Sequence, residues 1–230
     1  MKKIIQSQTL QNQAYDYLFN KIVSGELPPG ARLIEEKIAK ETEISRSPIR
    51  EAIRRLTSEG LVSVNPRGGV RVYQALHSDF KYLYECRKSL EPTAASLAAK
   101  RMNEVKKAEL NKLVNENIRA LEEEDYKQLK IVSSRFHELI LEGSGNPYLK
   151  KLMKQLNSLL MFYRNKIVDI TERLEKGSIE HQDIWRAIQK GDEEDAEKKM
   201  REHIEIDYQF YISKYGENDN GKYDGRKNLF

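Results

Sequence analysis

The sequence has little cysteine and no long apolar run. Cys86 is the single cysteine, which excludes an intrachain disulfide framework and fits a reducing compartment. No stretch approaches the roughly 18 consecutive apolar residues that a membrane-spanning helix needs. The first residues also lack the apolar core and small-residue cleavage site of a secretory signal. We therefore expect a cytoplasmic protein with no membrane partner.

Net charge is also scarce, and its distribution is uneven. The total is +4; residues 1–75 hold 12 Lys/Arg and 8 Asp/Glu, whereas residues 76–230 hold 28 of each. The whole excess therefore lies in the first third, where an anionic partner such as DNA would bind. An excess this small argues against a DNA-packaging protein that binds without regard to sequence. A length of 230 residues allows two domains.

The first 75 residues follow the order helix, helix-turn-helix and hairpin. Apolar residues at helical spacing predict helices over 10–24, about 34–42 and about 45–58, with Ser45 as the N-cap of the third. Valines on both sides of an Asn-Pro-Arg-Gly-Gly segment at 65–69 predict a two-stranded hairpin. We assign residues 1–75 to a winged helix-turn-helix domain.

The rest of the chain has helical periodicity throughout, so the fold class is mainly α. The predicted helices cover residues 78–101, 104–123, 125–143, 147–174, 178–190 and 192–212. One of these boundaries rests on Gly177-Ser178, interpreted as a break between two helices. We expect an all-helical bundle domain over 76–213 and a polar, glycine-rich flexible tail over 214–230.

The third predicted helix carries the residues that indicate DNA binding most specifically. Arg46 and Arg50, four residues apart, share a face that its apolar stripe does not use. Arginines at the start of a recognition helix can each donate two hydrogen bonds to guanine in the major groove. The hydroxyls of Ser45 and Ser47 suit phosphate oxygens, and Arg67 on the hairpin tip can reach the minor groove or backbone. The alternative is that these arginines form only the solvated face of the helix.

This segment resembles the winged-helix domain of GntR-type regulators. The resemblance is carried by Gly30-Ala31-Arg32-Leu33, Ile38-Ala39, Ser45-Arg46-Ser47-Pro48-Ile49-Arg50-Glu51-Ala52 and Glu59-Gly60-Leu61-Val62. It covers nearly all of residues 10–73. The residues that it implies as DNA contacts are Arg32, Ser45, Arg46, Ser47, Arg50 and Gly68.

The second part of the chain is similar to the all-helical FCD ligand-binding domain of the FadR subgroup. The matching pieces are Arg87-Lys88-Ser89-Leu90-Glu91-Pro92, Phe136-His137 with Gly145-Asn146-Pro147, and His181-Gln182-Asp183-Ile184 through to His203. The resemblance implies a divalent metal such as Zn²⁺ on His137, His181 and His203, since three imidazoles converging in a bundle core make a good metal site. Any one of these histidines alone would more often be a core residue.

One position departs from the family pattern. Many members have an aspartate four residues before the first histidine, and here that residue is Ser133. A neutral hydroxyl is a poor ligand and supplies no negative charge, so water or the carboxylate of an effector would complete the metal's shell. Asp207, one turn after His203, is a possible substitute. We therefore place Ser133 in the effector site.

The resemblance also places Arg87 in the effector pocket, where a guanidinium can clamp the carboxylate of a small organic acid. The alternative is a surface ion pair with Glu91, four residues on. Together these features predict a homodimeric, ligand-responsive transcriptional regulator that binds double-stranded operator DNA and is not an enzyme. The alternative function is a metal-dependent hydrolase with three histidine ligands.

Overall fold

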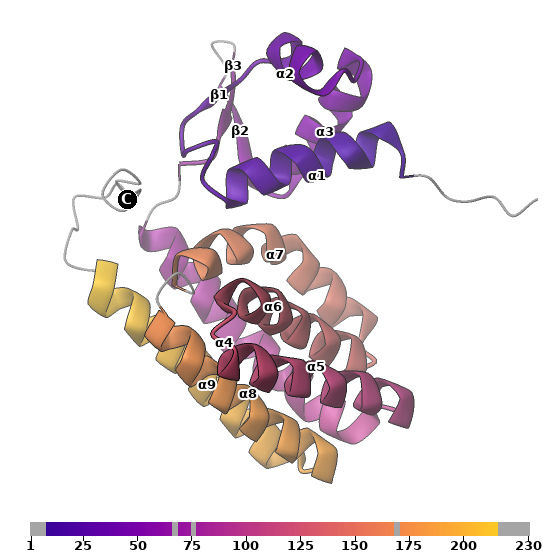
Figure 1. The fold of residues 1–230 in the computed structure, drawn as a ribbon, viewed down its shortest axis with the longest axis vertical. Helices are drawn as coiled ribbons and strands as arrows, with labels where there is room; N and C mark the ends of the chain where they lie inside the picture. Colours follow the sequence, from indigo (N-terminus) through magenta and orange to yellow (C-terminus); the bar gives the residue numbers. More distant parts are fainter. Residues whose placement is uncertain (1–7, 66–68, 75–76, 168–170, 216–230) are drawn as a thin grey trace, which may run out of the picture. The chain divides into compact units, whose positions relative to one another are not determined.

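The computed structural model describes residues 8–65, 69–74, 77–167 and 171–215 (Figure 1). These residues form two compact units, one ending at residue 74 and the other beginning at His77. Within the described ranges, no helix is both long enough and apolar enough to cross a bilayer. The predicted wing contacts Arg67 and Gly68, and the predicted tail from residue 216 onward, lie outside the described residues.

The first unit is a winged helix-turn-helix. Its elements are α1 (Leu10–Val23), β1 (Arg32–Leu33), α2 (Glu35–Thr42), α3 (Arg46–Ser58), β2 (Val62–Asn65) and β3 (Gly69–Val72). The three predicted helices are confirmed to within one residue at each end. Their core lies between α1 and α3, where Leu18 and Ile22 of α1 are buried together with the apolar stripe of α3, including Ile49 and Leu56.

The wing has a third strand that the sequence did not predict. β1 pairs antiparallel with β3, and β3 pairs antiparallel with β2, in the order β1-β3-β2. The amide of Val72 donates to the carbonyl of Ala31 at 2.9 Å, and the amide of Gly30 donates to the carbonyl of Val72 at 3.0 Å. A strand of two residues is too short to show alternating hydrophobicity, so only its distant pairing partner reveals it.

The second unit is an all-helical bundle. Its helices are α4 (His77–Arg101), α5 (Glu104–Glu122), α6 (Tyr126–Gly143), α7 (Pro147–Ile167), α8 (Thr171–Lys190) and α9 (Glu193–Tyr215). Side chains cap several of them: Asn103 and Asp125 accept backbone N–H groups at the starts of α5 and α6, and Asn146 does so at the start of α7.

The predicted boundary at Gly177-Ser178 is wrong. α8 already begins at Thr171 and runs through both residues. A β-carbon at Gly177 would lie 3.4 Å from the guanidinium of Arg173 on the preceding turn, which is ordinary van der Waals contact. A glycine inside a helical pattern lowers helix propensity by only about 1 kcal/mol, so burial of the apolar face of α8 can outweigh it.

Aromatic rings join α4 to α9, which lie side by side in the bundle (Figure 1). Phe80 stacks on Tyr211 with ring centroids 3.5 Å apart, and its ring also contacts Tyr84 and Tyr208. Three of the four rings, those of Phe80, Tyr84 and Tyr211, are fully buried. The first turns of α4 are thus fixed against the last turns of α9.

Candidate functional sites: a recognition helix and a buried histidine cluster

Arg46 and Arg50 lie at the start of α3, on its solvent-exposed side. Their side chains are 60% and 52% exposed. Ser45 occupies the N-cap position and makes no capping hydrogen bond through its side chain, so its hydroxyl and that of the exposed Ser47 face solvent. The N-terminal turn of α3 therefore presents two guanidiniums and two hydroxyls together.

Glu35 of α2 holds both arginines. Its carboxylate accepts from Arg50 Nε at 3.2 Å and Nη2 at 3.0 Å, and it lies 3.7 Å from Arg46 Nη2. The hydrogen bond from Arg50 lowers the pKa of Glu35 despite its partial burial. Because Arg50 donates two hydrogen bonds to one carboxylate, its guanidinium has a defined orientation before any DNA binds. The remaining predicted contact in this unit, Arg32, is exposed on β1.

The three predicted histidines converge in the core of the second unit. His137 of α6, His181 of α8 and His203 of α9 are all buried, and each offers a nitrogen within 4.8 Å of the other two. The Nε2 atoms of His137 and His181 are 3.2 Å apart. Of the groups searched among the described residues, this is the cluster that could hold a metal ion.

Carboxylates contact the Nδ1 atoms of two of these imidazoles. Nδ1 of His137 is 2.6 Å from Glu91, and Nδ1 of His203 is 2.6 Å from Glu180. An ionised carboxylate only accepts hydrogen bonds, so each Nδ1 carries the hydrogen and the Nε2 lone pair of the neutral ring is left for a metal. Nε2 of His203 has no hydrogen-bond partner within the described residues.

Both carboxyl groups are held in their ionised form. Burial raises the pKa of Glu91, but the charge of Arg87 and the contacts with His137 outweigh it and bring that pKa well below its usual value. Burial likewise raises the pKa of Glu180, and its bonds with His203 and Arg173 outweigh it and lower the pKa.

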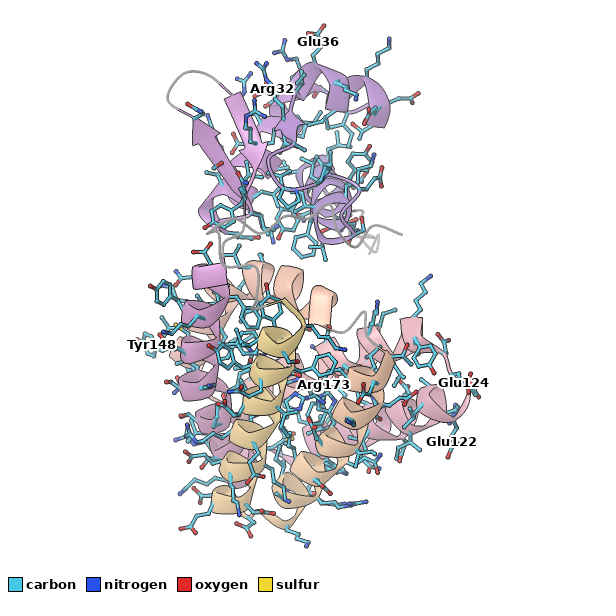
Figure 2. The ribbon with its side chains drawn as sticks, turned by 90° about the vertical axis from the view of Figure 1, so that its left-hand side faces the viewer. Arg32, Glu36, Glu122, Glu124, Tyr148 and Arg173 are labelled. Atoms are coloured by element: carbon cyan, nitrogen blue, oxygen red, sulfur yellow. The ribbon has the colours of Figure 1, made fainter. Side chains whose placement is uncertain are left out.

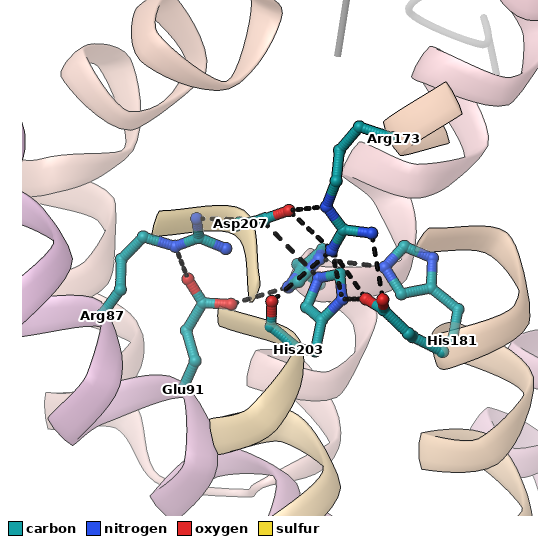
Figure 3. A network of polar contacts seen from close by, with 8 residues as sticks. Arg87, Glu91, Arg173, His181, His203 and Asp207 are labelled. Atoms are coloured by element: carbon teal, nitrogen blue, oxygen red, sulfur yellow. Dashed lines mark hydrogen bonds and ion pairs between the residues drawn. The ribbon is translucent and has the colours of Figure 1, made fainter. Parts of the chain in front are cut away.

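Arg87 is completely buried, so the predicted surface ion pair with Glu91 is wrong in its location, although the pair itself exists. Nε of Arg87 donates to Glu91 at 2.6 Å, and Nη1 lies 3.5 Å from Asp207 (Figure 3). Its Nη2 has no hydrogen-bond partner within the described residues. Burial opposes the positive charge, but Glu91 and other neighbours raise the pKa of Arg87. The arginine thus keeps one donor available in the interior.

Arg173 is a second buried guanidinium in the same network (Figures 2 and 3). It donates to Asp207 at 2.7 Å and to Glu180 at 2.6 Å, and its Nη2 is 3.3 Å from Nδ1 of His203. Asp207 thus lies between the two arginines, and its Oδ2 is 3.8 Å from Nε2 of His203. Sequence reasoning missed Arg173 and Glu180; the position of Glu180 directly before His181 was the only local signal.

Ser133 is buried one turn before His137 on α6. Its hydroxyl lies 3.5 Å from the side-chain nitrogen of Asn117, whose oxygen accepts a hydrogen bond from Ser178. A neutral, hydrogen-bonded group of side chains therefore occupies the position at which the family resemblance implied an aspartate.

Comparison with known families decides the class of this protein. Residues 10–72 match the family of bacterial regulatory proteins called gntR, and residues 82–206 match the FCD domain. The chain belongs to the GntR family of bacterial transcriptional regulators. It is a ligand-responsive, DNA-binding regulator with an FCD effector domain, and the alternative of a metal-dependent hydrolase is wrong.

Individual relatives match this chain over most of its length. The regulator is 32% identical over 197 residues to an uncharacterized HTH-type transcriptional regulator, YdhC of Bacillus subtilis, covering 85% of this chain and 88% of YdhC. It is 24% identical over 199 residues to the transcriptional repressor RspR of Escherichia coli, covering 86% and 87%. The solved structure of E. coli McbR/YncC superposes with a TM-score of 0.73 at 26% identity, covering 89% of this chain and all of that one.

Proposed function

We propose that the regulator reads its operator with Arg46 and Arg50 in the major groove. Their exposure, their place at the start of α3 and the orientation that Glu35 gives to Arg50 support direct base recognition. Further contacts with the DNA backbone would come from Arg32, Ser45, Ser47, Arg67 and Gly68. A homodimer would match a palindromic operator and double these contacts. Because the target is DNA, we expect the regulator to work in the cytoplasm.

We further propose that His137, His181 and His203 bind a divalent metal such as Zn²⁺. The observation that carries this proposal is the convergence of three buried imidazoles, each of which offers a ring nitrogen within 4.8 Å of the other two. Glu91 and Glu180 contact Nδ1 of His137 and Nδ1 of His203, so the Nε2 lone pairs of these two rings are left for a metal. The negative charge of these carboxylates also favours a bound cation.

The carboxylates of Glu91 and Glu180 change the expectation drawn from Ser133. A metal held by three imidazoles does not keep its full positive charge, because carboxylates lie directly behind two of the rings. The spare donor of the buried Arg87 supports a small organic acid as the effector.

The metal proposal predicts that protein purified without chelator contains about one divalent ion per chain, as measured by elemental analysis. The variant His137→Ala/His203→Ala is expected to contain none, because one imidazole cannot retain the ion. His77→Ala, which removes the fourth histidine, is the matched control and should keep the metal. Equal metal content in the double variant and the native protein would mean that the histidines are structural.

Restoring the family's carboxylate provides a second prediction. Ser133→Asp is expected to bind Zn²⁺ at least about tenfold more tightly than the native protein, because it adds a charged oxygen ligand. Ser133→Asn is the control, because asparagine has the shape of aspartate without its charge. This variant should not bind Zn²⁺ more tightly than the native protein. The extra charge would compete with an effector for the metal, and linkage requires any coupling between metal and effector to be reciprocal. Equal Zn²⁺ affinities in a chelator competition would contradict a metal site beside Ser133.

A further inference from the structure

A row of three polar side chains crosses the outer face of the wing sheet. The register places Arg32 of β1 opposite Arg71 of β3, and Arg71 opposite Ser63 of β2. All three are exposed, whereas the next residues along the strands, Leu33 and Val72, are buried. Successive side chains of a strand point to opposite faces, so the row lies on the solvent side of the sheet.

The two arginines of this row lack a counter-charge. In the described part of the chain neither Arg32 nor Arg71 forms an ion pair, and the polar contact of Arg71 is a hydrogen bond from Nη1 to the carbonyl of Gly30 at 2.8 Å. Each arginine of α3 is instead paired with a carboxylate: Arg46 and Arg50 with Glu35, Arg54 with Glu51, and Arg55 with Glu59. Like charges directly opposite each other on a sheet are destabilising, so the free protein gains nothing from this pair.

The row also lies close to the beginning of β3. A β-carbon at Gly69, the first residue of β3, would be 3.8 Å from Nε of Arg32, so that side chain lies across the beginning of β3. Arg71 follows two residues later on the same strand. Figure 2 shows Arg32 on the same side of this unit as Glu36 in the first turn of α2.

We propose that Arg32, Arg71 and Ser63 form a phosphate-binding row, with Arg71 and Ser63 as DNA-backbone contacts in addition to those proposed above. Two neighbouring guanidiniums and a hydroxyl match the oxygens of one phosphodiester, and its negative charge relieves the repulsion between the arginines. The inference rests on the proposed DNA interface. Phosphate contacts carry no sequence information, so the row strengthens binding to any duplex.

The test measures binding of a random-sequence duplex by fluorescence anisotropy between about 50 and 200 mM salt. Each phosphate contact contributes about 0.9 to the slope of log K against log salt. Arg71→Gln is expected to reduce the magnitude of that slope by about 1 and to weaken binding to operator and random duplex alike. Arg71→Lys retains the charge and should keep most of the slope.

Arg186→Gln removes an exposed arginine from the helical unit and should leave the slope unchanged. Thermal unfolding checks the fold of Arg71→Gln, whose melting temperature should stay close to that of the native protein, because loss of the hydrogen bond to Gly30 and loss of the like-charge repulsion oppose each other. A folded Arg71→Gln protein with the native slope would overturn the proposal. Its failure is distinguishable from failure of the base-reading proposal, since base reading changes the ratio of operator to random affinity and the row changes both affinities equally.

Discussion

Arg46→Ala/Arg50→Ala is expected to lose most of the regulator's discrimination between operator and random duplex. Each bidentate contact between an arginine and a guanine is worth about 1–3 kcal/mol, so the ratio of the two affinities should fall by roughly 30-fold to 10⁴-fold. Both side chains are exposed in the free protein, so the variant should fold normally. The operator is first selected from a random duplex library, and both affinities are then measured at one salt concentration.

Arg54→Ala is the matched control for this experiment. Arg54 lies on the same helix, is 68% exposed and pairs with Glu51. Arg54→Ala removes one positive charge, whereas the double variant removes two, and it does so about two and a half turns from the N-cap of α3. It is therefore expected to weaken binding to both duplexes without changing their ratio. An unchanged ratio in the double variant would mean that α3 contacts the backbone only and that the bases are read elsewhere.

Removing Glu91 alone is expected to destabilise the helical unit by about 3–5 kcal/mol, because it leaves the guanidinium of Arg87 buried without its main partner. Glu91→Ala is compared with the native protein by urea denaturation after metal removal. Trp185 reports on this unit, because it is the single tryptophan, is buried, and donates from Nε1 to Asn111 at 3.1 Å.

The control for Glu91→Ala replaces both members of the ion pair between Arg87 and Glu91. Arg87→Met/Glu91→Leu substitutes apolar side chains of similar size for the buried charges and should lose far less stability than Glu91→Ala, since such exchanges are often neutral. If the single and double variants are equally unstable, packing volume and not the unpaired charge dominates at this position. The double variant should not bind an organic acid at this position, because it lacks the guanidinium of Arg87.

Local patterns predicted the elements of the fold and failed where partners are distant. The stripe of α3 was evident because its apolar residues recur at helical spacing. β1 was missed because two residues show no period. The break at Gly177 was wrong because the packing of α8 in the bundle outweighs the low helix propensity of one glycine. Such features depend on contacts that only the folded chain creates.

The histidine cluster shows the same limit. The family resemblance placed His137, His181 and His203 together, and the structure brings them within 4.8 Å. The resemblance gave no indication of the carboxylates that contact these imidazoles. Glu91 is far from His137 in sequence, and the sequence suggested Arg87 as its partner. The assumption that Ser133 left the site without negative charge was therefore incomplete: the charge comes from the surroundings of the imidazoles.

The aromatic contact between α4 and α9 has a mechanical consequence. The chain leaves the winged-helix unit and enters α4, which carries Arg87 ten residues later, about 15 Å along the helix axis. α9 carries His203 and Asp207, and its next turn supplies the rings that stack on Phe80. Two helices joined in this way are expected to move together. An effector bound at Arg87 would therefore shift the first turns of α4 and the last turns of α9 as one body.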